Sequence, residues 1–348
     1  MGQVQRSSWL RSKLLRRRVF LLVTLVFILL AGFVIENLET WLGGTALRLD
    51  RPQNHLVQRG DTLTTLATRF SDNGLLSNPQ QLLLLARLQG GGNRILAGEY
   101  EFIPGQTVAQ LLAALTSGNT IKEQLTIIEG DTFAQLIERI HSAAGIVVTT
   151  ADLDPGEIMR EMGLPGEVAE GNFFPDTYFY SAGITDLTLL NRIHETMQSH
   201  LDSAWQDRAE GLAIDSPEAA LILASIIEKE SGTESERRRI SGVFHRRMER
   251  GMRLQADSTI IYGLGTEFDG DLRRRDMRRD TPYNSYLHGG LPPTAIALPG
   301  LASIRAAVNP DRSDETLYFV ATGKGGHKFS TTLAEHNRAV RRYQLGIK

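Results

Sequence analysis

The chain has 348 residues, and its 38 basic and 40 acidic side chains give a formal net charge of −2. This total hides an asymmetry, because residues 1–18 carry six bases and no acid while the rest carries a net charge of −8. A hydrophobic content of 41% excludes a disordered chain, and the acidic body argues against nucleic acid as a partner. The absence of cysteine excludes disulfides, cysteine nucleophiles and cysteine-ligated metal sites.

An apolar segment follows the basic leader. Residues 19–35 form an uncharged run, with Trp9 and Trp41 near the two expected membrane interfaces. We therefore predict a cytoplasmic tail at 1–18 and a single transmembrane anchor at 19–42. The positive-inside rule places the body across the membrane, which is the periplasmic side of the inner membrane in a Gram-negative cell. A buried core helix and a cleaved signal peptide are the alternatives.

A short pattern then repeats along the chain. Residues 57–63 and 127–133 each read as a strand, a glycine turn, an Asp-Thr pair and the start of an amphipathic helix, and residues 103–108 are a degenerate copy. Glycine suits the tight turn, and Asp or Thr caps the new helix. The first copy resembles the start of a LysM module, a small fold associated with glycan chains; a plain structural β-α unit is the alternative. We assign residues 50–118 to a LysM-like domain.

The remainder, residues 119–348, predicts one larger α+β domain. A Thr332–Glu335 capping box indicates the start of a last helix. The turn at 323–326 indicates a late hairpin. The periodic patterns predict helices at 133–143, 186–201, 217–230 and 234–250, and strands at 316–322 and 327–331.

The helix at 217–230 carries the strongest chemical signal. It is apolar all round and ends in two carboxylates, Glu228 and Glu230. The negative end of a helix dipole and apolar neighbours both raise a carboxyl pKa, as a general acid requires. Periodicity does not choose between the two glutamates, and both could instead pair with the basic run at 237–239.

Several segments of the chain match one known family in order. One of them, residues 224–231, contains the helix end at Glu228–Ser231. Together they resemble the endolytic murein transglycosylase family, also described as YceG-like. In that family the second glutamate of the Glu-Lys-Glu triplet is catalytic, which corresponds to Glu230. The matching segments are 172–178, 224–231, 251–257, 261–263, 281–286, 290–293 and 318–327.

The resemblance implies a reaction. The family cleaves the β-1,4 bond between N-acetylmuramic acid and N-acetylglucosamine within nascent peptidoglycan strands, leaves 1,6-anhydromuramic ends, and so helps terminate elongation. Most glycosidases use two carboxylates, but here Glu230 alone would act as acid and then as base. This chemistry needs no metal and no cofactor. The resemblance also implies that the protein acts beside the peptidoglycan synthases.

Other residues must hold the glycan. We predict substrate contacts at neutral or hydrogen-bonding groups near the matching loops. Phe329 ranks below the other candidates for substrate contact. Asp257 is the candidate second carboxylate, although it could also be a helix cap. Tyr283 could instead belong to the core, and Asn284 could shape a turn. The predicted substrate-binding residues are Gln255, Tyr283, Asn284, Ser231 and His327.

Two other functions remain open on the sequence. A hydrolase of the lysozyme kind would use Glu230 with Asp257 and leave a reducing end. A non-catalytic scaffold would bind the wall through the LysM-like part. The ends of the reaction products distinguish these possibilities.

Overall fold

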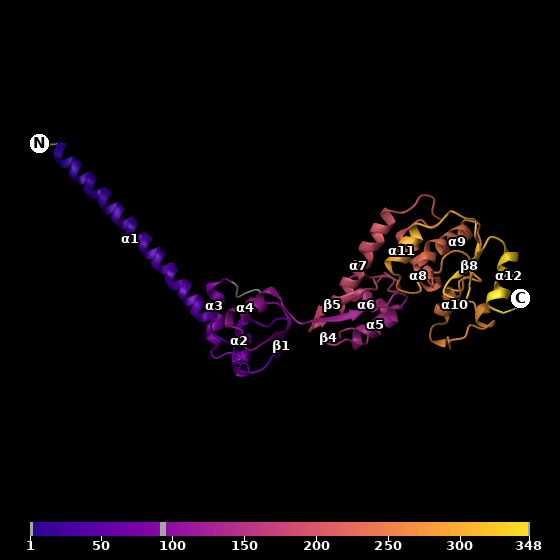
Figure 1. Ribbon diagram of the computed structural model, residues 1–348, viewed down its shortest axis with the longest axis horizontal. Coiled ribbons are helices and arrows are strands. Elements are labelled where there is room, and N and C mark those ends of the chain that lie inside the picture. The colour runs from indigo at the N-terminus through magenta and orange to yellow at the C-terminus, as the bar shows by residue number, and fades with distance from the viewer. Residues whose placement is uncertain (1–2, 91–94, 347–348) are drawn as a thin grey trace. The chain divides into compact units, whose positions relative to one another are not determined.

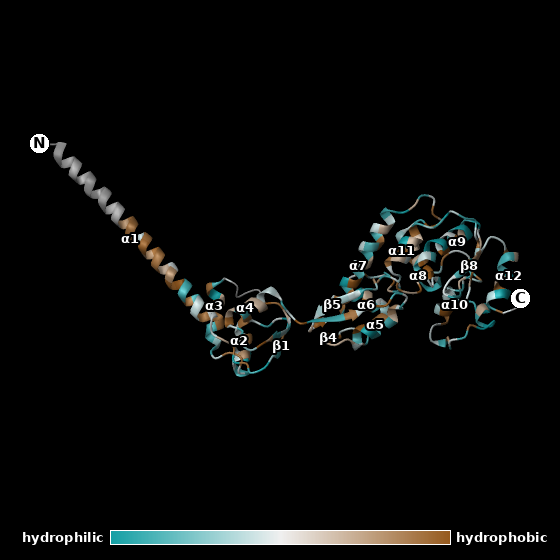
Figure 2. Cartoon of the chain, viewed as in Figure 1, coloured by the Kyte–Doolittle hydropathy of each residue, from teal (hydrophilic) through white to brown (hydrophobic). Residues whose placement is uncertain are grey.

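The computed structural model describes residues 3–90 and 95–346, with side chains from residue 20 onward. Helix α1 (Gln3–Gly43) contains one stretch, Phe20–Gly43, that is long and apolar enough to cross a membrane. Figure 2 shows most of this stretch as hydrophobic, with a hydrophilic section near its C-terminal end. Its side chains are exposed up to Trp41, whereas Leu42 is buried. The apolar helix predicted from the sequence is therefore present, and it extends well beyond the predicted segment toward the N-terminus.

The rest of the chain forms two compact units, which are described separately. The first comprises the chain up to residue 122 together with 181–183, and the second comprises 123–180 and 184–348. Each unit has buried apolar clusters of its own.

The first unit is built around a two-stranded antiparallel sheet. Strand β1 (Gln53–Val57) pairs with β2 (Gly98–Phe102), and Val57 lies opposite Gly98. Phe70, Tyr100 and Phe102 are buried against one another beside the sheet. The helices of this unit are α2 (Leu63–Asp72), α3 (Pro79–Leu88) and α4 (Val108–Ser117).

The end of α1 belongs to the core of the first unit. Leu42 is 2% exposed and packs in the same cluster as the α2 and α4 side chains. A Cβ atom added to Gly43 would lie only 2.9 Å from the Cβ of Ala109, so glycine permits this close approach. The apolar helix thus runs into the folded unit without an intervening linker.

The second unit begins with short strand pairs covered by helices, as Figure 1 shows. Strand β3 (Lys122–Thr126) pairs with β5 (Thr177–Ser181). Strand β4 (Ile146–Val147) runs parallel to β6 (Ile184–Thr185). The helices here are α5 (Phe133–Ser142), α6 (Pro155–Glu161) and α7 (Asp186–Gln206).

Helix α8 (Pro217–Glu230) lies at the centre of the second unit. Ser216 caps its start by accepting a hydrogen bond from the Ala219 N–H, and its apolar residues are buried on all sides. It packs against α7, α9, α10 and α11. The remaining elements are α9 (Arg237–Glu249), α10 (Asp257–Leu264), α11 (Leu301–Val308), β7 (Tyr318–Ala321), β8 (His327–Ser330), α12 (Leu333–Tyr343) and three short 3-10 helices at Glu234–Glu236, Gly265–Glu267 and Asp276–Arg278.

The mixed α+β class predicted from the sequence is confirmed. The predicted hairpin is the antiparallel pair of β7 and β8, and Thr332 forms a capping box with Glu335 at the start of α12. The predicted helix at 234–250 differs in one respect, because its first turn is a separate 3-10 helix and α9 begins at Arg237. The LysM resemblance of the first unit stays a prediction.

The repeated sequence pattern has the same local geometry in all three copies. Each turn glycine has a positive φ, 91° at Gly60, 85° at Gly105 and 83° at Gly130. Each is followed by a threonine N-cap and a helix of ten residues, α2, α4 or α5. In the first and third copies an aspartate pairs with an arginine eight residues later; these pairs are Asp61–Arg69 at 2.8 Å and Asp131–Arg139 at 2.6 Å.

Candidate active site

The two glutamates at the end of α8 have different environments. Glu228 accepts a hydrogen bond from Arg237 Nη2 at 3.0 Å and another from the Gly300 N–H at 3.0 Å, and its side chain is 6% exposed. Glu230 forms no ion pair with the residues that the structure describes and lines a cavity of about 540 Å³. Glu228 therefore holds the fold together, and Glu230 is the carboxyl group open to a substrate.

The surroundings of Glu230 suit a general acid. Burial raises its pKa most strongly, and the charge of Asp257 adds to that effect. The Ser258 hydroxyl donates to Glu230 Oε1 at 2.7 Å, and this bond and the nearby His327 lower the pKa. The net result is a raised pKa, which favours the protonated form that a general acid needs.

Asp257 lines the same cavity as Glu230. It is the first residue of α10, and its Oδ1 accepts a hydrogen bond from the Tyr286 hydroxyl at 2.6 Å. Ala256 occupies the N-cap position, so Asp257 does not have the cap role considered from the sequence. A second carboxylate is thus present in the cavity beside Glu230.

Gln255 also lines the cavity, in a strained backbone conformation. Its φ of 53° is the one positive value among the non-glycine residues in the described part of the chain. The buried Arg247 holds this segment, because its Nη1 donates to the Arg253 carbonyl at 3.1 Å, the Leu254 carbonyl at 2.7 Å and Gln255 Oε1 at 3.3 Å. Strain at a cavity wall is typical of functional positions.

Arg247 was not among the residues expected from the sequence. Its signal is its place on α9, four residues after Val243 and three after Phe244, on a face that is otherwise apolar and buried. Its guanidinium also lies 5.0 Å from the ring centre of Tyr318 and donates to the Leu317 carbonyl at 2.7 Å. An arginine on a buried helix face therefore marks a structural clamp.

His327 reaches the cavity from β8. Its Nδ1 lies 2.8 Å from Glu236 Oε2, and its backbone N–H donates to Glu236 Oε1 at 3.0 Å. The Phe319 ring packs edge-on against it at 5.4 Å. Glu236 therefore fixes the imidazole at the cavity wall. Glu236 was also missed from the sequence, because nothing in its 3-10 helix distinguishes it from an ordinary exposed acid.

Four predicted contacts lie outside the cavity wall. Asn284 is fully buried; its amide donates to the Met277 and Arg279 carbonyls, and its oxygen accepts the Tyr286 N–H. Every polar group of that side chain is engaged in shaping the turn, and its predicted substrate contact stays a prediction. The other three are Tyr283, Ser231 and Phe329.

None of these three side chains lines the cavity. The Tyr283 hydroxyl is hydrogen-bonded to Thr294 at 2.9 Å, and the ring packs on Tyr262. The Ser231 hydroxyl is buried without a partner while its N–H ends α8. Phe329 is buried beneath the Arg239 guanidinium, 4.1 Å from its ring centre. The structure therefore brings Glu230, Asp257, Gln255 and His327 together and leaves these three in the fold around them.

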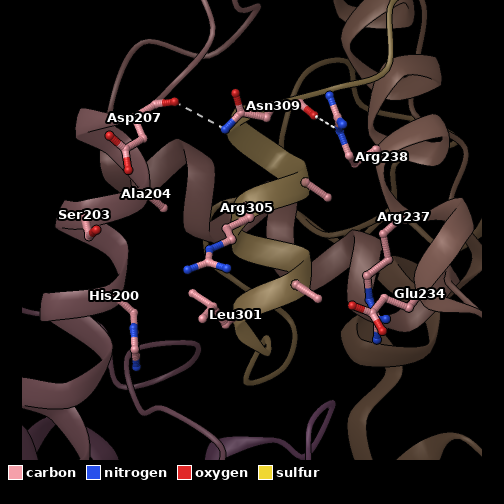
Figure 3. Close-up of a pocket in the computed structure, with 12 residues that line it drawn as sticks. His200, Ser203, Ala204, Asp207, Glu234, Arg237, Arg238, Leu301, Arg305 and Asn309 are labelled. Carbon is pink, nitrogen blue, oxygen red and sulfur yellow. Dashed lines mark hydrogen bonds between the residues drawn. The ribbon is translucent and has the colours of Figure 1, made fainter.

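Cavity size alone does not identify the site. A larger cavity, about 750 Å³, lies between α7, α9 and α11 and is shown in Figure 3. Arg305 and His200 face it, and Arg238 is bound to the Asn309 carbonyl at 2.9 Å. The smaller cavity is the better candidate, because it contains Glu230 at the end of the buried apolar helix α8 together with Asp257, Gln255 and His327.

Comparison with known proteins decides the family. The model of the YceG-like family matches residues 56–342. The chain belongs to the YceG-like family. This match includes all four residues that the structure brings together in the cavity.

Relatives and a solved structure agree with that assignment. The endolytic murein transglycosylase of Bacillus subtilis is 28% identical over 82% of this chain and 83% of its own length. The endolytic murein transglycosylase of Streptococcus pneumoniae is 26% identical over 82% of this chain but only 57% of its own length. A crystal structure of a yceG-like protein from Listeria monocytogenes has a TM-score of 0.52 and 27% identity, covering 82% of this chain and 98% of that one.

Proposed function

We propose that the protein is a membrane-anchored endolytic lytic transglycosylase of peptidoglycan. It cleaves the β-1,4 bond between N-acetylmuramic acid and N-acetylglucosamine within glycan strands and leaves 1,6-anhydromuramic ends. The observation that carries this proposal is Glu230, delivered by a buried apolar helix to an open cavity in a chain of the YceG-like family. The names of the Bacillus and Streptococcus relatives support the same class of reaction.

One carboxyl group can perform both proton transfers. Protonated Glu230 gives its proton to the glycosidic oxygen as the bond from that oxygen to the muramic C1 breaks. The C6 hydroxyl of the same muramic residue attacks C1, and the Glu230 carboxylate takes the hydroxyl proton. No water is consumed, and Glu230 ends in its starting protonation state.

The other cavity groups have supporting roles in this proposal. Asp257 places negative charge near the sugar as positive charge develops at C1. Gln255 and His327 offer hydrogen bonds to the glycan from fixed positions. These assignments agree with a reaction that is driven by one acid and by electrostatic stabilisation around it.

The N-terminal helix acts as an uncleaved anchor in this proposal. Leu42 is in the core of the first unit, and the Leu47 N–H donates to the Gln106 carbonyl at 2.8 Å. Cleavage between residues 43 and 46 would remove Leu42 from that core. Residues 1–18 then stay in the cytoplasm, and both units lie on the periplasmic side, where nascent glycan and the peptidoglycan synthases are found.

A digestion experiment tests the proposal. Peptidoglycan sacculi are incubated with the full chain in detergent, and the soluble products are analysed by mass spectrometry. We expect anhydromuropeptides, each lighter by one water than the corresponding reducing product. Glu230→Gln should lower the rate by about a thousandfold or more while the protein still binds sacculi.

The second candidate is a hydrolase of the lysozyme kind. The presence of Asp257 in the cavity with Glu230 favours it, because two carboxylates serve most glycosidases. Products with reducing muramic ends in place of anhydro ends would identify the protein as such a hydrolase. Unchanged cleavage by Glu230→Gln would show that Glu230 is not the acid of either reaction, whereas no cleavage by the wild type would leave a wall-binding scaffold.

A further inference from the structure

The two oxygens of Glu230 are held unequally. Oε1 accepts the Ser258 hydroxyl proton at 2.7 Å and lies 3.4 Å from the Ser258 backbone nitrogen. Glu230 Oε2 makes no hydrogen bond with the residues in the described ranges. Because both Ser258 groups are donors, they occupy the lone pairs of Oε1 and leave Oε2 as the oxygen that carries the acidic proton.

We propose that Ser258 is a positioning residue, which holds Glu230 by Oε1 and reserves Oε2 for proton transfer to and from the glycan. The proposal rests on the proposed function and adds which oxygen reacts and what orients it. Ser258 does not itself touch the reacting atoms. Its effect passes through the rotation of the Glu230 carboxyl group.

The position of Ser258 in α10 supports this role. It is the second residue of that helix, where backbone N–H groups have no partner within the helix. Glu230 thus receives both the side chain and the exposed N–H end of α10. Two donors from one rigid element fix the plane of a carboxyl group better than a single flexible contact does.

The other charged groups around Glu230 act through space. Asp257 of α10 raises its pKa, and His327 of β8 lowers it. Arg247 of α9 donates to backbone carbonyls and to Gln255, and the Tyr286 hydroxyl donates to Asp257.

None of these groups donates to Glu230 in the described part of the chain, so the orientation of the carboxyl group depends on Ser258. The hydroxyl also stabilises the charged form of Glu230 and lowers its pKa. Its removal should therefore raise the pKa of Glu230. Since the reaction starts from protonated Glu230, activity would persist to higher pH.

The test compares three substitutions in the full chain. Ser258→Ala removes the hydroxyl, Ser258→Thr keeps it, and Ser258→Val has the shape of threonine with no hydroxyl and leaves less space for a replacing water. The measurement is kcat/KM for release of anhydromuropeptides across a pH series. We expect Ala and Val to lose about tenfold in kcat/KM and to move the alkaline limb up by about one pH unit, while Thr stays near the wild type.

A matched control is Ser241→Ala. Ser241 is buried on α9, and its hydroxyl has no hydrogen-bond partner among the described residues, so this change should alter neither rate nor pH profile. Circular dichroism confirms that each variant is folded. If Ala and Val lose activity with the alkaline limb unmoved, or keep the wild-type rate, the positioning role is wrong. If the wild type itself yields no anhydro ends, it is the proposed function that fails.

Discussion

The turn before α2 in the first unit and the turn before α5 in the second have the same local structure but different surroundings. Gly60 has open space around the position of a Cβ atom. Gly130 instead donates its N–H to the Leu298 carbonyl at 2.9 Å, and its own carbonyl accepts Lys229 Nζ at 3.1 Å. Lys229 is the neighbour of Glu230, so the copy in the second unit braces the helix that ends at Glu230.

The comparison teaches how one local motif acquires two uses. The glycine turn, threonine cap and aspartate–arginine pair build the same strand-to-helix connection in either unit. In the second unit Glu170 adds a further bond, because it accepts the Phe133 N–H at the start of α5 and the Tyr262 hydroxyl of α10. The motif and Glu170 thereby join α5 to α8 and α10.

The largest expected difference between the two units is in how their stability depends on pH, and it comes from Glu170. Burial raises its pKa from 4.5 to about 7, above its value in an unfolded chain. The folded state therefore binds this proton more tightly, and the second unit should lose about 3 kcal/mol of stability as pH rises from 4.5 to about 7. Hydrogen exchange of the α5 amides measures this loss separately from the first unit.

Glu170→Gln is the matched variant for that measurement. Glutamine can still accept the Phe133 N–H but does not ionise, so the pH dependence should flatten and the variant should exceed the wild type above pH 7. The α2 amides of the first unit should show no such change. A wild-type α5 whose stability is constant over this range would contradict the assignment.

The next effect comes from the two aspartates. Asp61→Ala and Asp131→Ala each remove a nearly buried partner of an arginine, and each should destabilise its own unit by about 2 kcal/mol. Only Asp131→Ala should also lower kcat/KM, since its backbone carbonyl accepts the Leu298 N–H at 2.7 Å beside the α8 brace. Equal activity of the two variants would mean that the brace does not reach Glu230.

The turn glycines should give a smaller effect. Alanine at either position is strained at the positive φ, which should cost about 1 kcal/mol in both units. At Gly130 the new methyl group would lie 3.7 Å from the Lys229 side chain, an ordinary contact. Thermal unfolding of Gly60→Ala and Gly130→Ala should therefore show similar shifts; a much larger shift for Gly130→Ala would reveal a tighter site.

The smallest effect is expected when only the hydrogen bond from Lys229 to the Gly130 carbonyl is removed. Lys229→Met keeps the aliphatic stem and removes the bond to the Gly130 carbonyl, and it should lower kcat/KM about threefold with little change in stability. Arg69→Met is the counterpart in the first unit and should leave kcat/KM unchanged. The kcat/KM of both variants is measured in the same sacculus digestion assay.

The sequence predicts the features that depend on neighbouring residues. The repeated glycine and threonine positions, the Thr332–Glu335 capping box and the apolar helix that ends at Glu230 all follow from local rules. The choice between Glu228 and Glu230 does not, because it depends on Arg237 and Gly300 closing around one of them.

The missed residues have the same explanation. Ser258, Arg247 and Glu236 act through partners 28, 70 and 91 residues away in the chain, at Glu230, Leu317 and His327. The role of Asn284 is not decided by the sequence, because an amide in a loop looks the same in sequence whether it faces a ligand or the inside of a turn. Only the packing of distant segments distinguishes the two cases.

The direct passage of α1 into the first unit has a consequence for how the enzyme would meet its substrate. Leu42 lies in the core and Gly43 packs closely against Ala109, so no flexible linker separates the apolar stretch from the folded unit. With the helix in a bilayer, the first unit is confined to the layer beside the membrane. Encounters with glycan then occur by lateral diffusion in two dimensions, and newly made strands near the membrane are met before mature wall.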